Sequence, residues 1–341
     1  MPLQNKIHRT AFTFGSLNTR HYGTMVLSPS GEVRVYENPN EQTYRLTGDL
    51  LELCSDTGAV TSRARWHEEA CAFLPLDNVR HYLLPLLTLE PPVPSRRTAR
   101  IIVNTVPKSG TYLVEEVLTR LGYRSLHLHL NPDGLHDNRG VPPAKIHFDP
   151  DGRFVPCPRR AVAELLAPGE FAIGHIDSQD ELAAIRAAGV HVIGTIRDLR
   201  AVAISHFRFK RDKVKPYLPG DHLLAQLAPR EAFLVYLVQA AERELPAFMK
   251  QTRFIMTDEC CLLRFEEMAA GRLGTRARTG LNAIERGLAA DFEAALAGAL
   301  GQPTATFSGK ISEAQDYVWP EVDQIYDTIG YLEANREAGY P

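Results

Sequence analysis

The sequence predicts an α/β protein in which helices flank a central parallel sheet and a small antiparallel β module comes first. Three observations support this prediction. Short strand-like segments fill residues 1–95, a proline- and arginine-rich segment follows, and apolar strands then alternate with helical patterns. We therefore divide the chain into an N-terminal β-rich module, residues 1–95, and an α/β domain, residues 96–341.

The N-terminal module is predicted from the segments GTMVLS, EVRVYE, TYRLTG, LLELCS and AVTSRA, which turn clusters such as SPSG and SDTG separate. The segment LLPLLTLEPPVPSRRTAR, residues 83–100, is predicted to be the linker because its prolines interrupt regular structure. Tyr22, Tyr36, Tyr44 and Trp66 suit the core of such a module. Glycan binding and homo-oligomer contacts are the alternative uses of these aromatic rings.

The α/β domain is predicted from three strand-then-helix or strand-then-loop repeats. ARIIVNTV precedes TYLVEEVLTRLGY, EFAIGHI precedes DELAAIRAAG, and VHVIGTI precedes a mixed polar stretch. Such alternation favours parallel strands with crossover helices. We expect residues 288–301 to form a packing helix, and loops within 124–170 and 206–260 to shape a cleft above the carboxyl edge of the sheet.

Composition limits the classes of function. Hydrophobic residues make up 44% of the 341-residue chain and charged residues 23%, as in an ordinary globular protein. The net charge of -3 gives no reason to expect nucleic acid as a partner. Five cysteines without zinc-site spacing suit a reducing compartment, and no apolar stretch reaches the length that a bilayer requires. We expect a cytoplasmic protein that is not transmembrane.

The stretch IIVNTVPKSGTYL has the features of a phosphate-binding turn. The strand 101–105 would end at a loop in which Gly110 permits close backbone approach and Thr111 begins a helix, whose free N–H groups attract an anion. Lys108 adds a positive charge, and Ser109 and Thr111 add hydroxyl groups. On this motif alone, an ordinary strand-to-helix turn with a surface lysine fits equally well.

A second anion site is predicted in VHVIGTIRDLRAVAIS. Arg197 follows the strand directly, and Ser205 comes eight residues later, roughly two helical turns along. A guanidinium group suits a phosphate, and a serine hydroxyl can complete the same site. The alternative is a surface ion pair between Arg197 and Asp198 with Ser205 on a helix surface.

These motifs together resemble a known family. PKSGTYL, residues 107–113, is similar to the 5′-phosphosulfate loop of sulfotransferases that use 3′-phosphoadenosine 5′-phosphosulfate (PAPS), and RDLRAVAIS, residues 197–205, is similar to their 3′-phosphate motif. LLRFEEM, residues 262–268, and FSGKISEAQDYVWPEV, residues 307–322, resemble two later signatures of the family. The ordered matches cover residues 98–340 and leave the N-terminal module outside.

The resemblance implies roles for the first loop. Lys108 would contact the 5′-phosphate and the bridging oxygen, and so stabilise the leaving phosphate. The backbone amides of Ser109, Gly110, Thr111 and Tyr112 would hold the phosphosulfate oxygens.

The resemblance also implies the remaining contacts to the donor and its product, 3′-phosphoadenosine 5′-phosphate (PAP). Arg197 and Ser205 would bind the 3′-phosphate, with Gly309 and Lys310 closing that site, although Ser-Gly-Lys departs from the commoner Arg-Lys-Gly triplet. Phe265 would stack on adenine or would be a core residue.

His175, in EFAIGHIDS, matches the catalytic histidine of the family. It would take the proton of the acceptor hydroxyl as that oxygen attacks sulfur, and no metal is implied. Gly174 stands where many relatives carry a lysine, which leaves Lys108 as the main cation near the leaving group.

Three histidines in LHLHLNPDGLHDN, namely His127, His129 and His136, raise the question of zinc. Strand alternation would put His127 and His129 on one face, but no Cys or carboxylate set with standard spacing follows. The segment fits the lining of an acceptor cleft beside His175 better. The basic run FRFKRDKVK, residues 207–215, fits a solvated helix end, or a cover for the nucleotide.

The sequence therefore predicts a PAPS-dependent sulfotransferase whose acceptor is a carbohydrate, another small molecule or a lipid alcohol. Two alternatives belong to other classes. One is a P-loop-like kinase, which the missing upstream glycine spacing disfavours. The other is a non-catalytic protein that binds an adenosine phosphate or a glycan.

Overall fold

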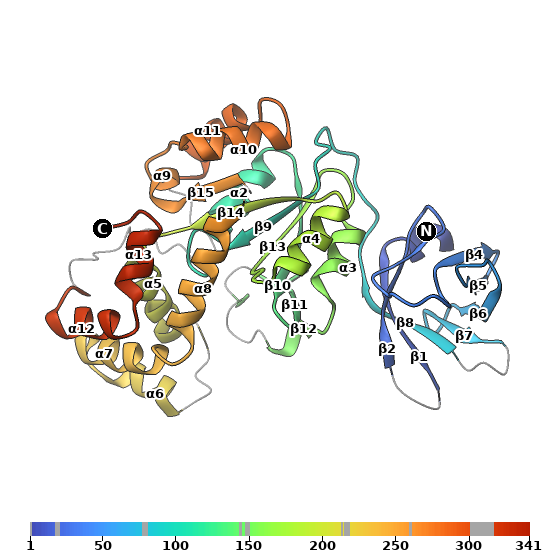
Figure 1. The fold of residues 1–341 in the computed structure, drawn as a ribbon, viewed down its shortest axis with the longest axis horizontal. Helices are drawn as coiled ribbons and strands as arrows, with labels where there is room; N and C mark the ends of the chain where they lie inside the picture. The colour runs from blue at the N-terminus through green and yellow to red at the C-terminus, as the bar shows by residue number, and fades with distance from the viewer. Residues whose placement is uncertain are drawn as a thin grey trace.

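The structure is a computed structural model of the 341-residue chain. It describes residues 2–17, 21–76, 81–142, 145–146, 151–212, 214, 219–258, 261–300 and 317–341. Within these residues the strands form two sheets, one N-terminal and one in the α/β domain (Figure 1).

The N-terminal sheet has eight strands in the described residues, in the order β3-β2-β1-β8-β7-β6-β5-β4, and every named pairing in it is antiparallel. Its elements are α1 (Leu3–Ile7), β1 (Thr10–Ser16), β2 (His21–Leu27), β3 (Val33–Arg34), β4 (Thr43–Thr47), β5 (Leu50–Cys54), β6 (Val60–His67), β7 (Ala72–Pro75) and β8 (His81–Thr88). Because β8 pairs with β1, the strands that come first and last along the chain are neighbours within this sheet.

Two details of this module differ from the prediction. EVRVYE contributes only the two-residue strand β3, and Val35 beside it has a left-handed backbone (φ 75°) that ends regular pairing. The predicted linker begins too early, because residues 83–88 belong to β8. Pro85 is tolerated there as an exposed residue at an irregularity in the β1–β8 register, where a missing N–H costs least.

The aromatic residues of the module mostly fill its own core. Phe12, Phe14 and Phe73 are buried, and Tyr44 is 9% exposed among them. Tyr36 and Trp66 pack against this cluster, whereas Tyr22 is 45% exposed. The core reading therefore holds for Tyr44, Tyr36 and Trp66.

The second sheet has the order β12-β11-β10-β13-β9-β14-β15 within the described residues, and its five strands from β10 to β15 pair in parallel. Its strands are β9 (Ile101–Thr105), β10 (Arg124–Asn131), β11 (Gly134–Asp137), β12 (Phe154–Val155), β13 (Glu170–Gly174), β14 (His191–Ile196) and β15 (Cys261–Arg264). The predicted α/β class, with an antiparallel module before it, is confirmed at this level. The central position of β9 places its carboxyl end between those of β13 and β14.

Helices cover both faces of the second sheet (Figure 1). They are α2 (Thr111–Arg120), α3 (Arg159–Leu165), α4 (Gln179–Ala187), α5 (Leu199–Asp212), α6 (Pro219–Gln226), α7 (Pro229–Ala240), α8 (Glu244–Thr257), α9 (Phe265–Ala269), α10 (Thr275–Ile284), α11 (Leu288–Ala299), α12 (Pro320–Thr328) and α13 (Tyr331–Glu337). Strand alternation separates two cores: Ile101 and Val103 pack with α2, α10 and α11, while Ile102 packs with α3, α4, α5 and α8.

Residues 206–260 are mainly helical rather than the cleft-shaping loops that we expected. Pro229 occupies the first turn of α7, where a proline is compatible with a helix. Phe233, Tyr236, Leu237 and Ala240 recur at helical spacing on that helix and are buried. The burial of these side chains stabilises α7 as a helix. The predicted packing helix at 288–301 is present as α11.

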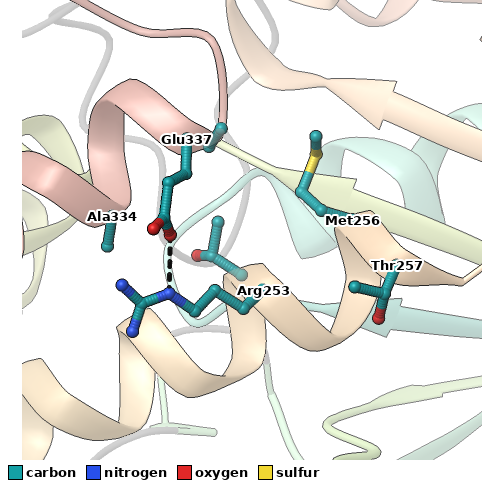
Figure 2. Close-up of a pocket in the computed structure, with 7 residues that line it drawn as sticks. Arg253, Met256, Thr257, Ala334 and Glu337 are labelled. Atoms are coloured by element: carbon teal, nitrogen blue, oxygen red, sulfur yellow. Dashed lines mark hydrogen bonds and ion pairs between the residues drawn. The ribbon is translucent and has the colours of Figure 1, made fainter.

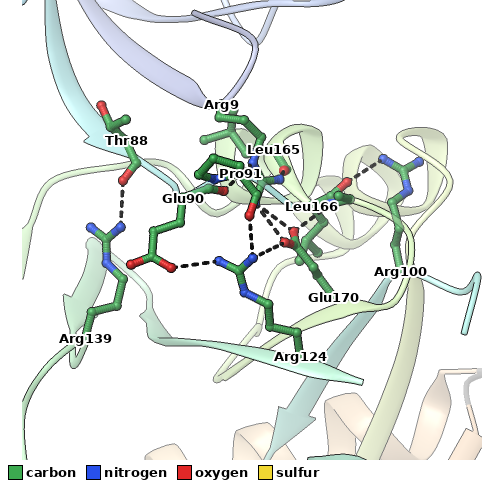
Figure 3. A network of polar contacts seen from close by, with 11 residues as sticks. Arg9, Thr88, Glu90, Pro91, Arg100, Arg124, Arg139, Leu165, Leu166 and Glu170 are labelled. Atoms are coloured by element: carbon green, nitrogen blue, oxygen red, sulfur yellow. Dashed lines mark hydrogen bonds and ion pairs between the residues drawn. The ribbon is translucent and has the colours of Figure 1, made fainter. Parts of the chain in front are cut away.

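The two sheets are joined through a buried ion pair and an apolar contact. Arg9, at the start of the N-terminal sheet, donates to both carboxylate oxygens of Glu170 at 2.9 Å, and both side chains are buried. Arg9 also donates to the carbonyl of Leu165, and Arg124 approaches Glu170 at 3.6 Å (Figure 3). Ala11, Val26, Leu87 and Leu89 of the N-terminal module share a core cluster with α3. The N-terminal module is therefore packed on the α/β domain rather than tethered to it by a free linker.

Candidate active site

The loop between β9 and α2 has the shape of an anion-binding turn. Lys108 has φ 68° and Gly110 has φ 96°, so the chain is left-handed at both positions before α2 begins. A lysine in that conformation is strained, which is typical of functional loops. No side chain caps the helix. Among the described residues, no acceptor is recorded for the amides of Gly110 and Thr111, and these N–H groups can meet an anion.

The hydroxyl groups of this loop are turned into the sheet, contrary to our expectation that they would be donors to a ligand. Ser109 Oγ lies 2.6 Å from Thr195 Oγ1 and donates to the Val106 carbonyl, whose oxygen also accepts the Ser109 amide at 3.1 Å. Thr111 Oγ1 donates to Thr105 Oγ1 at 2.9 Å. Both residues therefore fix the loop to β9 and β14, and only main-chain groups face outward from these positions.

Gly110 has a second reason to be glycine. A Cβ atom placed on it would lie 2.8 Å from Cδ2 of Phe265, the first residue of α9. The guanidinium of Arg197 lies over the Phe265 ring, 4.1 Å from its centroid. The three residues thus form a stack from the phosphate-type loop through an aromatic ring to the predicted 3′-phosphate site.

Arg197 follows β14 and is 9% exposed. Its Nη1 donates to the backbone carbonyl of Lys108 at 3.1 Å, so the two predicted anion sites are in direct contact. Burial lowers the pKa of Arg197, and the carboxylates of Glu266 and Asp198 oppose this shift. The Arg197 Nε atom is buried, and no hydrogen-bond partner for it is recorded in the described residues. A buried guanidinium with an unused donor suits an anion that arrives with the ligand.

Arg197 and Asp198 do not form the surface ion pair that was the alternative prediction: none is recorded between them in the described residues. Asp198 instead caps α5: its Oδ1 accepts from the Ala201 amide at 2.9 Å, and its Oδ2 accepts from Asn335 at 3.3 Å. The Leu199 amide donates to Asn335 Oδ1 at 2.8 Å. This capping leaves the Arg197 side chain free to turn toward Lys108.

The other predicted 3′-phosphate residues are less well defined. Ser205 lies on α5 and is partly buried, and no contact between it and Arg197 is recorded in the described residues. Gly309 and Lys310 lie outside the described residues.

His175 directly follows β13 and is held on several sides. Its Nδ1 donates to the Thr105 carbonyl at 2.6 Å, and its amide donates to the Leu130 carbonyl at 3.0 Å. The buried guanidinium of Arg159 donates to the His175 carbonyl. Next to it, the Asn104 side chain bonds both backbone groups of Ile176. These contacts orient the imidazole and fix its tautomer.

Gly174 is explained by the approach of β10. A Cβ atom on Gly174 would lie 2.4 Å from the carbonyl oxygen of Leu130 and 2.5 Å from its Cβ. No side chain of any size fits there, so a lysine at this position is excluded by packing. Position 174 therefore offers no cation, and the charges that act on His175 come from Lys108 and Arg159.

Lys108 is partly buried against α5. Its Nζ lies 3.2 Å from the centroid of the Phe209 ring. Burial and, to a lesser degree, the nearby charge of Arg197 together lower the pKa of Lys108 to about 7. Lys108 in turn lowers the pKa of His175 and of His206, which burial mainly brings to about 4 and about 3. Lys108 is therefore close enough to both His175 and His206 for its charge to lower the pKa of each.

His129 was predicted to line the cleft, and it meets His175 directly. The Nε2 atoms of the two rings are 3.1 Å apart, and the ring planes are inclined at 63°. On β10 the leucines 126, 128 and 130 are buried, while His127 and His129 between them are not, as alternation predicts. The two histidines nevertheless have different partners, because His127 Nδ1 lies 3.4 Å from Glu115. Among the described residues, no group of three metal-ligating side chains is found.

Sequence reasoning missed three residues of this site: Phe209, His206 and Arg159. Phe209 and Ser205 are four residues apart on one predicted helix, and that spacing places them on one face. This signal was available, but the charges around Phe209 favoured a solvated helix end. Lys210 in that run in fact pairs with Glu244 at 3.1 Å. No local pattern points to Arg159.

A separate pocket lies between α8 and α13 (Figure 2). Its volume is about 200 Å³, and the Arg253–Glu337 ion pair, at 2.7 Å, lines it. None of the predicted site residues contributes to it.

In the described residues, no helix has the length and apolar character needed to cross a membrane.

No protein-family model matches the sequence. No curated protein matches it either. Among solved structures, the chain is similar to the crystal structure of mouse sulfotransferase SULT7A1 complexed with PAP, with a TM-score of 0.45 and 12% sequence identity over 72% of this chain and 88% of that chain.

Proposed function

We propose that this chain is a sulfotransferase that moves the sulfuryl group of PAPS to an acceptor hydroxyl. The observation that carries the proposal is the meeting of Lys108, Arg197 and His175 at the carboxyl ends of the adjacent strands β9, β14 and β13. Arg197 touches the Lys108 carbonyl, so two anion-binding groups lie together where ligands of open α/β sheets bind. A donor with phosphates at both ends matches this arrangement.

The proposed donor contacts follow from the loop geometry. The amides of Gly110, Thr111 and Tyr112, at the start of α2, would hold the phosphosulfate oxygens. Ser109, predicted to join them, uses its amide and hydroxyl within the protein and would instead hold the loop in shape. Arg197 and Ser205 would bind the 3′-phosphate, with Gly309 and Lys310 predicted to close the site.

Phe265 supports the same donor in a second way. One face of its ring is covered by the Arg197 guanidinium, and its edge contacts Gly110. We propose that the ring keeps the two anion sites in register and presents its remaining surface to adenine.

The chemistry requires alignment and charge stabilisation. The acceptor oxygen attacks sulfur as the bond from sulfur to the bridging oxygen breaks, and the electron pair of that bond stays on the phosphate. Protonated Lys108 would stabilise this charge, and an imidazole of the site, predicted to be His175, would take the acceptor proton. No covalent intermediate and no metal are part of this proposal.

The test is incubation with PAPS and an acceptor panel. The panel contains chitooligosaccharides, 4-nitrophenol and dodecanol, and mass spectrometry detects the added sulfo group. We expect transfer to one class, and Lys108→Ala to lower turnover by ~10²-fold or more. Lys6→Ala, in the N-terminal module, is the matched control and should keep its activity. A wild-type protein that binds PAP but never converts PAPS to PAP would contradict the proposal.

The same assay separates the alternatives. A kinase would transfer phosphate from ATP and would require Mg²⁺. A non-catalytic binding protein would bind PAP with no transfer, and substitution of Lys108 or His175 would affect only binding.

A further inference from the structure

We infer that Phe209 is a positioning residue for sulfuryl transfer, because the face of its ring holds the ammonium group of Lys108 in the site. This inference rests on the proposed sulfotransferase function and deepens it, since neither the motifs nor the resemblance gave Phe209 a role. It follows from the contacts at the two ends of Lys108 and from the charges around it.

Lys108 is held at both ends. Its carbonyl accepts a hydrogen bond from Nη1 of Arg197 at 3.1 Å, and its Nζ lies 3.2 Å from the centroid of the Phe209 ring. The second distance is well inside the ~6 Å within which the face of an aromatic ring attracts a cation. Arg197 follows β14 and Phe209 lies in α5, so a strand exit and a helix together set the place of the lysine.

The partner of the ammonium group is a ring and not a carboxylate. Within the described parts of the chain, no ion pair of Lys108 is recorded, and the one charge that shifts its pKa is that of Arg197. Lys210, the residue after Phe209, is the opposite case, because it lies 3.1 Å from Glu244 and 3.7 Å from Asp221. A carboxylate would cancel the charge that a phosphate has to meet, whereas a neutral ring attracts the ammonium group and leaves its charge to the donor.

Phe209 is itself part of an aromatic cluster. The centroid of the His206 ring lies 6.2 Å from that of Phe209. Nδ1 of His206 lies 2.9 Å from the hydroxyl of Tyr236 in α7, and its ring meets Phe248 of α8 edge-on at 5.1 Å. Because α5, α7 and α8 all contribute to this cluster, the ring that faces Lys108 has a defined place.

The neighbouring titratable groups agree with this role. Burial lowers the pKa of His206 on α5 to about 3 and that of His175 after β13 to about 4, so both are neutral near pH 7 and do not repel the ammonium group. Arg197 does repel it. Burial and the charge of Arg197 lower the pKa of Lys108 to about 7, so the ring offsets only part of the cost of burial.

A lysine held in this way is prepared for the donor. The side chain of a free lysine rotates about several bonds, and fixing it when the donor binds costs entropy. The contact with Phe209 removes part of this cost beforehand, as in other sites that stabilise developing charge with preorganised groups. We therefore expect the ring to influence PAP affinity and turnover through Lys108.

The test replaces Phe209 in the full chain by phenylalanines with one, two or three ring fluorines. Fluorine draws electron density from the ring face and weakens its attraction for a cation in steps, while ring size changes little. NMR of ε-¹³C-labelled lysine, without donor, gives the pKa of Lys108, whose signal is the one lost in Lys108→Met. We expect the acid dissociation constant of Lys108 to rise by ~2–30-fold over the series. PAP affinity at pH 7, measured by calorimetry, should fall with each fluorine.

Phe233 of α7 is the matched control. It is buried, its recorded ring contacts are with other aromatic rings such as Tyr317, and no cation is recorded over it in the described residues. The same fluorines there should leave the pKa of Lys108 and PAP affinity unchanged. A constant pKa of Lys108 across the Phe209 series, or equal changes in both series, would overturn the inference. PAP affinity that ignores the fluorines would overturn the positioning role.

Two ordinary substitutions give a readout in turnover. Phe209→Tyr keeps an aromatic face and should keep the rate with PAPS within ~2-fold, whereas Phe209→Leu keeps an apolar side chain without that face and should lose ~2–30-fold. Equal rates in the two variants would contradict the role of the ring. If wild-type protein neither binds PAP nor transfers the sulfuryl group, the sulfotransferase proposal fails, and the fluorine series still decides whether the Phe209 ring holds the lysine.

Discussion

Nη1 of Arg197 donates a hydrogen bond to the backbone carbonyl of Lys108 at 3.1 Å, which joins the exit of β14 to the loop after β9. The same guanidinium lies over Phe265, which contacts Gly110. One arginine therefore links the predicted 3′-phosphate site to the predicted 5′-phosphosulfate loop. A change in its side chain should affect both ends of the donor.

Arg197→Lys should weaken PAP binding by ~10–100-fold. A lysine keeps the charge but lacks the planar fork that can bond a carbonyl, stack on a ring and contact a phosphate together. Isothermal titration calorimetry with PAP measures the effect. Arg200→Lys is the control, since Arg200 lies three residues away, in α5, and pairs with Asp323 of α12 at 3.2 Å. Equal losses in the two variants would argue against a special role for Arg197.

Lys108→Met should make the protein more stable while removing transfer activity. Burial holds the pKa of Lys108 at about 7 in the folded protein, against 10.5 when unperturbed. The folded state thus binds fewer protons than the unfolded state between these pH values, and wild-type stability rises with pH there. Replacing this partly buried, desolvated cation by methionine should stabilise by ~1–4 kcal/mol below pH 7.

This gain from Lys108→Met should shrink as the pH rises from 7 toward 10.5. Urea unfolding at pH 6 and pH 9 measures it. A less stable variant at pH 6 would show that Lys108 is already well paired in the absence of ligand.

PAP binding should take up a proton at pH 8. Lys108 is mostly neutral above its pKa of about 7, and a phosphate beside it favours the charged form and raises that pKa. Calorimetry in buffers of different ionisation enthalpy gives the number of protons taken up. We expect close to one for wild-type protein and close to none for Lys108→Met. Equal uptake by both proteins would assign the proton to another group.

Gly110→Ala should lower both stability and PAP affinity, for two separable reasons. The residue has φ 96°, and an added Cβ would lie 2.8 Å from the Phe265 ring. We expect a loss of ~1–3 kcal/mol in unfolding free energy from backbone strain and overpacking together. In a Phe265→Ala background the steric part should disappear and the conformational part remain. Strictly additive effects would show that the ring contact carries no energy.

Glu170→Gln should destabilise the whole protein by ~3–5 kcal/mol, because it leaves the buried Arg9 charge without its counterion. Arg124, which is also near Glu170, adds to the repulsion. The paired change Arg9→Met with Glu170→Leu should be much milder. Chemical denaturation followed by tryptophan fluorescence measures both. Independent unfolding of the N-terminal module in wild-type protein would contradict the coupling that Figure 3 depicts.

The order of elements and the positions of the two anion motifs could be predicted from the sequence. Apolar strands ending in charged turns locate Lys108 and Arg197 at strand exits, and parallel pairing puts such exits on one edge of a sheet. Helical spacing also predicted the helix within 288–301. The same spacing is present in α7 and around Phe209, where a loop and a solvated helix end were expected. These features depend on periodicity within a dozen residues, which is why the sequence reveals them.

By itself, then, the sequence determined the α/β architecture and which residue types gather at the edge of its sheet. Tertiary structure decided how they meet: that Ser109 turns its hydroxyl inward, that Gly174 leaves no room for a lysine, and that Nε2 of His129 lies 3.1 Å from Nε2 of His175. The reason is that these contacts depend on the register between β10 and β13 and on the packing of α5 against the loop. Residues far apart in the chain set both, and no local pattern records the distance between them.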